Sequence, residues 1–387
     1  SRTLSGVEGS GMKHLRKPAS ILAGGVAVLL VAGLAGLGLA KDTPGEGAGT
    51  ATAQFLKFLR TPRGVAMGEA HTAIANDAGA AYWNPAGLAN LKQWQVSAAY
   101  FNWSLGSGAS ASNTGFLSGA FPVHAAKGVI GVNVGYSDPG VGNEDSTDAF
   151  GVPVAGGVKL KASDLVGGVT YARRMEMKDA DLNLGGTVKT VRSVLGDTAN
   201  SYRATALALD VGLQYRFGSE KRIAAGAALE NLGTKMKFVS ESDALPLAGR
   251  IGLGYVPFKV KDHEVKVASD LVLPSDRKLH VNLGAEYWYA GLAAARVGWS
   301  ALGDVSNKAA GGGVTGLTAG VGVRYQDFQV DLAYVPKENF GNQYRVGLTY
   351  NFGAAKAQSE REARLREAER RAKAAAEQLK DISTPSK

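Results

Sequence analysis

The chain has 387 residues with 52 glycines, 12 prolines and no cysteine, and its formal net charge is +9. The absence of cysteine excludes disulfides, thiol nucleophiles and cysteine-based zinc sites. Residues 1–40 and 354–387 contribute +3 each, so the long middle region offers no basic groove for nucleic acid. Abundant glycine among finely interleaved apolar and polar residues is typical of a wall of tilted strands.

The first predicted element is an export signal. A basic stretch at 13–17 precedes an apolar stretch at 19–39, and residues 38–40 place small side chains at −3 and −1 of a cleavage site. We therefore expect residues 1–40 to comprise upstream sequence and a signal peptide that is removed. The alternative is a retained transmembrane helix over 19–40, whose length would just span a bilayer.

The next region, residues 41–93, does not alternate. Its stretch 54–91 is rich in small residues, weakly helical at 66–81 and broken at Asn84-Pro85. Such a segment cannot cross lipid alone, because its irregular backbone would leave polar groups unsatisfied. It can either cap a membrane protein from the periplasm or fold inside it, where protein surrounds the backbone.

From Trp94 to Phe352 the chain divides into runs of about ten residues that alternate with period two, which is the pattern of tilted membrane strands. In the last run the bulky apolar residues occupy one face and polar residues the other. Aromatic residues gather near the ends of the runs, as at a membrane interface. Fourteen strands are predicted, at 94–103, 113–123, 128–137, 164–174, 182–194, 203–217, 222–231, 247–257, 264–272, 279–289, 291–300, 316–325, 327–335 and 343–352.

The connections between these runs alternate in length. Segments 138–163 and 301–315 are long, whereas 124–127 and the single residue 326 are short. Short turns on one side and long loops outside are typical of outer-membrane barrels. The sequence therefore predicts an all-β fold, a fourteen-stranded antiparallel transmembrane barrel over 94–352. An even number of strands places both termini in the periplasm of a Gram-negative cell.

Charged residues also occur inside the predicted strands, on the face opposite the bulky apolar side chains. An arginine facing lipid near the bilayer midplane would cost about 2–4 kcal/mol. We therefore expect these residues to face the lumen, either as a salt-bridge lattice that holds a plug, which we favour, or as a substrate track. They are Asp210, Arg216, Arg250, Asp270, Arg296, Arg324, Asp331 and Arg345.

The end of the chain carries two further predicted elements. Tyr344, Tyr350 and Phe352 present aromatic rings on the outward face, where we expect the barrel-assembly machinery to read its signal. Residues 353–387 form a tail that is predicted to be helical over 356–380. It is either a periplasmic docking element or a solvated helix, with a contact stripe at heptad spacing made of Leu365, Ala368, Ala372, Ala375 and Leu379.

No catalytic or metal-binding pattern is found. The five histidines are scattered, and the glycine-rich pattern at 311–316 leads into a strand, so no helix amino terminus is offered to a phosphate. We expect neither an enzyme, nor a cofactor, nor a metal site. Four acidic residues of the longest loop lack a regular calcium-ligand spacing and are expected to be solvated: Asp138, Glu144, Asp145 and Asp148.

Residues 54–89 resemble the amino-terminal region of the PorV/PorQ family, a branch of the FadL-like fatty-acid-transporter superfamily. Further matches lie at 164–165, 171–174, 286–288, 322–325 and 331–336. The resemblance implies a fourteen-stranded barrel with an amino-terminal hatch in its lumen. It also assigns the hatch motif, or lumen plug, to Trp83, Asn84, Pro85, Ala86 and Gly87.

This resemblance leaves the role open. FadL-like members pass hydrophobic molecules across the outer membrane, whereas PorV serves type IX secretion as a barrel that binds exported cargo. We expect a non-enzymatic component of an envelope transport, secretion or motility machine; the alternatives are a transporter of hydrophobic small molecules and a sealed structural barrel. Expected partners are outer-membrane lipid and lipopolysaccharide, the barrel-assembly machinery, a periplasmic or envelope protein at the tail and, for a transporter, a hydrophobic ligand, but not nucleic acid.

Overall fold

The computed structural model describes residues 51–103, 112–139, 146–147, 153–154, 161–197, 200–301, 316–336 and 342–353, together with Glu367 and Arg370. All of these belong to the second of two compact units, residues 39–387. The predicted signal peptide, the glycine-rich pattern at 311–315 and the tail stripe lie outside the described residues. So do three of the four acidic loop residues, at positions 144, 145 and 148.

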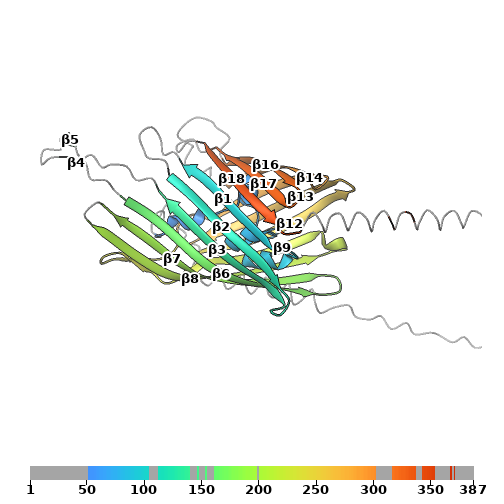
Figure 1. Cartoon of the computed structure of the whole chain (residues 1–387), viewed down its shortest axis with the longest axis horizontal. Helices are drawn as coiled ribbons and strands as arrows, with labels where there is room; N and C mark the ends of the chain where they lie inside the picture. The colour runs from blue at the N-terminus through green and yellow to red at the C-terminus, as the bar shows by residue number, and fades with distance from the viewer. Residues whose placement is uncertain are drawn as a thin grey trace, which may run out of the picture. The chain divides into compact units, whose positions relative to one another are not determined.

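Fourteen strands form one closed barrel in which every neighbouring pair is antiparallel (Figure 1). They are β1 (Gln95–Trp103), β2 (Ser112–Val123), β3 (Gly128–Asp138), β6 (Lys161–Glu176), β7 (Asp181–Gly196), β8 (Ser201–Phe217), β9 (Ile223–Gly233), β12 (Ala248–Val260), β13 (His263–Pro274), β14 (His280–Tyr289), β15 (Ala293–Ser300), β16 (Leu317–Tyr325), β17 (Phe328–Val335) and β18 (Gln343–Asn351).

The predicted fold is confirmed, and each predicted strand corresponds to one barrel strand. Strands β6, β7 and β8 continue two or three residues beyond the predicted runs at their loop ends, and β12 continues three residues further at the opposite end. Two short hairpins were not predicted because two-residue strands carry no visible alternation. They pair β4 (Ser146–Thr147) with β5 (Pro153–Val154) and β10 (Met236–Lys237) with β11 (Ser242–Asp243).

The first and last strands close the barrel. β1 pairs with β18 from Gln95 opposite Asn351 to Phe101 opposite Arg345. The last strand ends one residue earlier than predicted, although the Phe352 N–H still donates to the Trp94 carbonyl oxygen at 2.9 Å. Side chains of β18 alternate as expected, with Tyr344 exposed and Arg345 buried.

The two ends of the barrel differ in their connections. Short segments such as 124–127, 177–180, 261–262 and 326–327 join strands at one end, called here the short-turn end, where β1 begins and β18 finishes. Longer segments such as 234–247 and 301–316 join strands at the opposite, long-loop end. The connection between β7 and β8, residues 197–200, is short although it lies at the long-loop end, because these two strands extend the sheet into the region expected to be loop.

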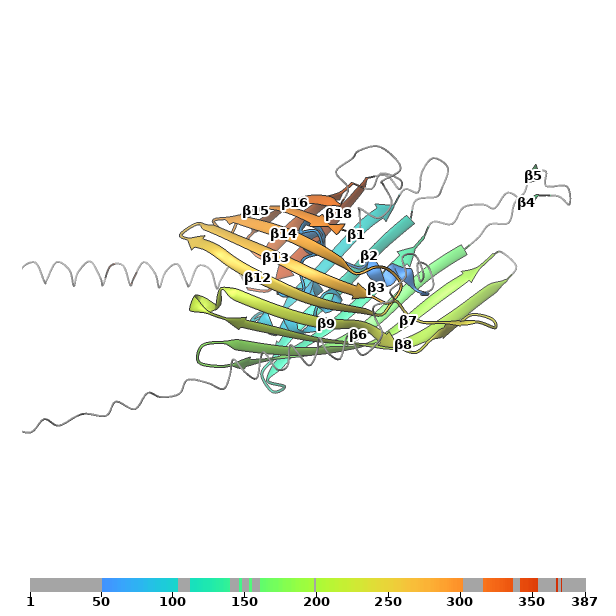
Figure 2. The ribbon, with the colours of Figure 1, turned by 180° about the vertical axis from the view of Figure 1, so that it is seen from behind.

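Before β1, the chain forms four short helices inside the barrel (Figure 2). They are η1 (Gln54–Lys57), α2 (Pro62–Ala66), η2 (Ala78–Tyr82) and η3 (Pro85–Asn90). The first strands contact η2, strands β3 and β6–β8 contact η3, and β15–β18 contact α2. No helix among the described residues is long and apolar enough to cross a membrane.

The weak helix expected over 66–81 does not form as one element. Gly68 and Glu69 both have positive φ, at 66° and 67°, which is a conformation that ends a right-handed helix. Turns then lead to η2. The helices of this segment are therefore short, and its backbone N–H and C=O groups must form hydrogen bonds with the barrel wall.

Candidate functional site

Residues 51–91, called here the lumen segment, cross the interior from one end of the barrel to the other. At the long-loop end the Thr52 N–H donates to the Ala244 carbonyl oxygen at 3.0 Å. Nearby, Gln54 Nε2 donates to Asp276 in the connection between β13 and β14, at 2.9 Å. The segment then finishes at the short-turn end and leads into β1. Residue 51 and the start of β1 therefore lie at opposite ends of the lumen.

Trp83, the first residue of the predicted hatch motif, is fully buried in the lumen segment. Its indole N–H donates to Thr61 Oγ1 at 2.9 Å, and the guanidinium groups of Arg60 and Arg250 lie 4.8 and 5.3 Å from its ring. The His71 ring meets it edge-on at 5.3 Å. Arg250 belongs to β12, so Trp83 contacts both the lumen segment and the barrel wall.

The remaining motif residues turn the chain against β7 and β8. Asn84 caps η3, since its Oδ1 accepts from the Ala86 N–H at 3.1 Å. Its Nδ2 donates to the Leu213 carbonyl oxygen of β8 at 2.9 Å. Pro85 occupies the first position of η3, where its missing N–H costs nothing. Ala86 and Gly87 are also buried, so the structure brings all five residues together inside the lumen.

Glycines of the wall let the backbone of the lumen segment approach closely. A Cβ atom added at any of eleven wall glycines would lie 3.0 Å or less from an atom of this segment. The abundance of glycine, which is typical of a wall of tilted strands, therefore has a further cause in this barrel. This glycine ring consists of Gly131, Gly135, Gly185, Gly212, Gly226, Gly252, Gly254, Gly284, Gly298, Gly320 and Gly347.

Six of the eight charged residues predicted to face the lumen are buried, and Arg216 and Arg324 are partly buried. Two ion pairs form within the set: Arg250 with Asp270 at 3.1 Å and Arg296 with Asp331 at 2.8 Å. Of the other four, Asp210 pairs with Lys189, Arg324 donates to Gln329 and Arg345 donates to Gln343.

Several of these charges also hold the lumen segment. Asp270 accepts from the backbone N–H groups of His71 and Thr72, each at 3.0 Å, and from Thr72 Oγ1 at 2.6 Å. Arg345 Nη1 donates to the Phe58 carbonyl oxygen at 2.9 Å. The irregular backbone is thus satisfied by wall side chains, as burial in a dry interior requires.

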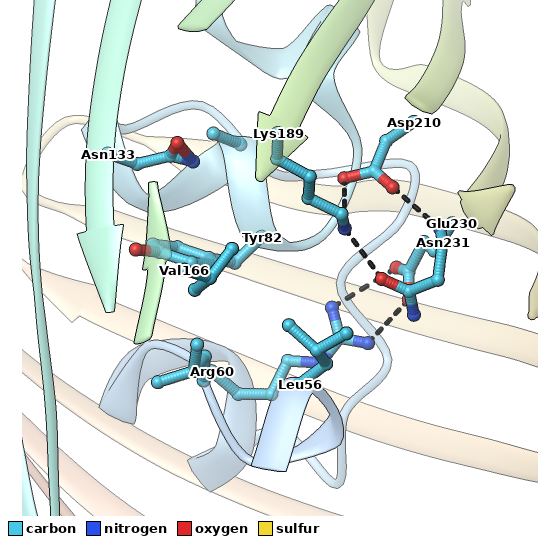
Figure 3. A pocket seen from close by; sticks show the side chains of 11 residues that line it. Leu56, Arg60, Tyr82, Asn133, Val166, Lys189, Asp210, Glu230 and Asn231 are labelled. Atoms are coloured by element: carbon cyan, nitrogen blue, oxygen red, sulfur yellow. Dashed lines mark hydrogen bonds and ion pairs between the residues drawn. The ribbon is translucent and has the colours of Figure 1, made fainter. Parts of the chain in front are cut away.

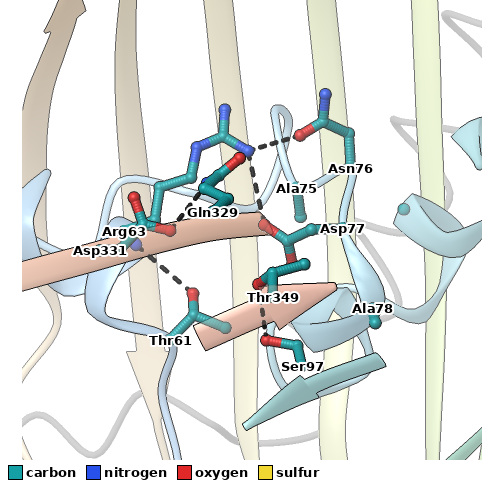
Figure 4. Close-up of polar contacts among 12 residues, drawn as sticks. Thr61, Arg63, Ala75, Asn76, Asp77, Ala78, Ser97, Gln329, Asp331 and Thr349 are labelled. Carbon is teal, nitrogen blue, oxygen red and sulfur yellow. Dashed lines mark hydrogen bonds and ion pairs between the residues drawn. The ribbon is translucent and has the colours of Figure 1, made fainter. Parts of the chain in front are cut away.

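The strongest links between segment and wall were not predicted. Arg63 bonds Glu286 of β14 through two parallel hydrogen bonds of 2.8 and 2.9 Å, and also contacts Asn76 and Asp77 (Figure 4). Arg60 bonds Glu230 of β9 in the same way, at 3.1 and 2.6 Å. Alternation within the predicted strands could have found both glutamates. The arginines lie in a region without periodicity, so no signal marked them.

Burial dominates the ionisation of the lumen segment. It lowers the pKa of His71 well below the ordinary value, and the positive charge of Arg63 lowers it further. His71 is therefore neutral, and neither of its ring nitrogens has a hydrogen-bond partner among the described residues. Burial also raises the pKa of Asp77, although the neighbouring Arg63 acts in the opposite direction.

A small cavity of about 20 Å³ lies where the segment meets β7–β9 (Figure 3). Its wall contains a β-bulge in which Asp210 opposes Glu230 and Asn231, with Asn231 at a φ of 63°. Lys189 donates to both Asp210 and Asn231, at 2.7 and 2.6 Å. The Tyr82 hydroxyl has no partner among the described residues. The cavity has room for a single water molecule and forms no open pore.

Toward the long-loop end the lumen contains an apolar cluster. Phe55, Leu56 and Leu59 of the lumen segment pack against small side chains of the wall and under the connection between β9 and β12. The wall and loop residues of this cluster are Ala99, Phe116, Val166, Val191, Ala204, Ala206, Ala208, Met236 and Leu245. The long-loop mouth of the lumen is therefore lined differently from the charged region around Glu286.

Comparison with solved structures shows which fold this is. A monoaromatic hydrocarbon channel, a TodX mutant, has a TM-score of 0.51 at 12% identity and covers 75% of this chain and 97% of its own. The toluene transporter TbuX of Ralstonia pickettii has a TM-score of 0.51 at 13% identity, with the same coverage. At such identity the likeness shows the fold alone.

Two sequence comparisons gave no match: no family model matches the chain, and neither does any curated protein. The chain thus shares its barrel fold with these two solved structures. The structural neighbours do not address the PorV/PorQ branch in particular.

Proposed function

We propose that the protein is an outer-membrane channel for small hydrophobic molecules, which pass through the lumen when the lumen segment rearranges. The observation that carries this proposal is a closed fourteen-stranded barrel filled by an irregular amino-terminal segment, a fold it shares with a toluene transporter. Eight strands already fill their own interior, so a wall of fourteen needs a separate filling. When the lumen segment moves, a path can open while the hydrogen bonds between the barrel strands stay intact.

The outer surface supports the membrane location. Val188, Leu207 and Leu253 are exposed to 63%, 57% and 60% on outward-facing positions, whereas polar residues of the same strands are buried in the lumen. An apolar exterior with a polar interior is the reverse of a soluble barrel and is typical of one in lipid. No catalytic constellation is proposed.

The apolar cluster at the long-loop end supports the class of solute. Water-filled porins present polar side chains to their lumen. Here Ala204, Ala206 and Val191 face inward near the long-loop end, and Phe55 and Leu56 cover them. A hydrophobic molecule entering from that end would exchange one apolar contact for another.

A sealed structural barrel is the second candidate, and the glycine ring favours it. Contacts this close, together with the Arg60–Glu230 and Arg63–Glu286 pairs, resist displacement of the lumen segment. Membership of a secretion or motility machine, as in the PorV/PorQ family, rests on the sequence resemblance alone.

A reversible disulfide between the lumen segment and the wall, called here the lock, distinguishes the channel from the sealed barrel. A Cβ built on Gly254 lies 3.7 Å from Ala73 Cβ, within the range of about 3.5–4.5 Å that a disulfide needs. The same Cβ would collide with Ile74. The variant is therefore Ala73→Cys/Ile74→Ala/Gly254→Cys, and the natural chain adds no other thiol.

Uptake of toluene into liposomes is then measured with the same protein before and after reduction, with Ile74→Ala as the control. We expect saturable uptake by the control and the reduced lock, and none by the oxidised lock. Absence of uptake by the unmodified protein would leave only the sealed barrel. Equal uptake in both redox states would show that the lumen segment does not move at Ala73.

A further inference from the structure

Three positively charged residues stand on the outward face of neighbouring strands at the long-loop end: Lys161 on β6, Arg192 on β7 and Arg203 on β8. All three are exposed. Alternation places Leu165 and Leu207 on the same face, exposed to 45% and 57%. The charges therefore lie directly beyond an apolar outer band. We call these three residues the outer basic face.

The register makes Arg192 and Arg203 close neighbours, whereas Lys161 pairs four residues away from Arg192. Arg192 pairs with Leu165 on one side and with Thr205 on the other. Arg203 is two residues from Thr205, so it is a diagonal neighbour of Arg192, at about 7–8 Å between backbones. Lys161 lies further toward the loops, opposite Gly196. Figure 1 shows β6, β7 and β8 side by side and extending past β1 and β2 at this end.

These three cations differ from those of the lumen. Arg60, Arg63 and Arg296 each face a carboxylate. Among the described residues, Lys161, Arg192 and Arg203 form no ion pair. The neighbouring like charges of Arg192 and Arg203 repel one another, so an anion opposite them would stabilise the arrangement.

The other barrel strands differ from β6–β8 in their outward charges. In the described long-loop halves of the other strands, outward positions carry no lysine or arginine. The one acidic side chain there is Asp138, the last residue of β3, which has an interaction of its own. In the described part of the chain, the outward cations of the long-loop halves are thus confined to β6–β8.

We propose that the outer basic face binds the phosphate groups of an anionic lipid in the outer leaflet. A cation on lipid costs about 2–4 kcal/mol at the midplane but about 0–1 near the interface, where phosphates lie. Arginine forms paired hydrogen bonds with phosphate oxygens, and Thr205 adds a hydroxyl. The proposal rests on the membrane location and orientation of the proposed function, with the long loops outside.

Lipid binding by the full chain tests this directly. Purified protein in detergent is titrated with lipopolysaccharide, with the same lipid after enzymatic dephosphorylation, and with inorganic phosphate. The variant Arg192→Gln/Arg203→Gln keeps polar side chains at both positions and removes both neighbouring charges. Arg173→Gln is the matched control, because Arg173 is an exposed arginine on β6 near the short-turn end.

We expect the double variant to bind lipopolysaccharide at least about tenfold more weakly and Arg173→Gln to bind it unchanged. The dephosphorylated lipid should bind the wild type as weakly as the intact lipid binds the double variant. Equal binding of both lipids, or an equal loss in the control, would overturn the proposal. So would competition by millimolar inorganic phosphate alone, which would indicate a site for the free ion.

Heat-modifiable gel migration confirms that each variant is folded before binding is measured. No transported solute enters the experiment. A barrel that conducts nothing can therefore still bind the lipid, and a conducting barrel can fail to bind it.

Discussion

Separating Arg63 from Glu286 should weaken the protein in a way that reveals how the lumen segment is held. The two side chains share two hydrogen bonds, with 8% and 0% of their side-chain surface exposed. Glu286 also bonds Arg296 at 2.7 Å and lies 3.4 Å from Lys266. The carboxylate therefore serves three cations, whereas Arg63 depends mainly on this one carboxylate.

The two single variants should consequently differ. Glu286→Gln leaves two buried guanidinium groups short of a carboxylate and should cost about 3–5 kcal/mol in the free energy of unfolding. Arg63→Met leaves Glu286 with its other cations and should cost about 1–3 kcal/mol. Together the variants should cost less than the sum, with a coupling of about 1–3 kcal/mol.

The free energy of unfolding is measured for the wild type, both single variants and the double variant. Each protein is unfolded with guanidinium in lipid vesicles and followed by tryptophan fluorescence. The pair Arg222–Glu220 at the short-turn end, with 32% and 67% of its side-chain surface exposed, is the control, where coupling should not exceed about 1 kcal/mol. If the losses for Arg63 and Glu286 add within about 0.5 kcal/mol, the two residues do not act together. The segment would then be held by packing against the glycine ring alone.

Four further outcomes are expected. Phe352→Asp should abolish heat-modifiable migration and leave the protein to periplasmic degradation, because an outward aromatic ring at the barrel seam becomes a charge. Ala86→Cys, at a fully buried position, should react far more slowly with a membrane-impermeant maleimide than Val239→Cys, which is 66% exposed. Deletion of 356–387 should leave the barrel assembled and remove only a co-purifying envelope protein; an unfolded product would contradict this. Burial lowers the pKa of Lys57 from 10.5 to about 8, so the folded chain binds fewer protons between these values. The free energy of unfolding should therefore rise with pH over that window, and Lys57→Met should flatten the rise.

Barrel strands could be predicted because each buries one face and exposes the other. The alternation from Gln343 to Asn351 is uninterrupted, and the strand was predicted to within one residue. The loop ends of β6–β8 were missed because the outward face becomes polar there, as at Lys161 and Ser163 and again at Ser201 and Arg203. Beyond the apolar band, period two no longer separates the faces.

Only part of the candidate site could be predicted from the sequence, for a physical reason. The cost of charge in lipid assigns Asp270 and Arg345 to the lumen without any coordinates. Which group each charge bonds depends on tertiary contacts: Arg63 and Glu286 are 223 residues apart. The glycine ring was equally hidden, since a glycine such as Gly298 looks the same whether it eases curvature or admits a neighbouring backbone.

The path of the lumen segment dictates an order of assembly. β1 continues directly from a segment that runs the whole length of the interior, and β1 is also one side of the closing seam with β18. A chain could not be threaded afterwards through an interior packed this tightly against the glycine ring. The seam must therefore form last, around a segment already in place. The amino-terminal residues thus act as an internal template on which the wall is completed.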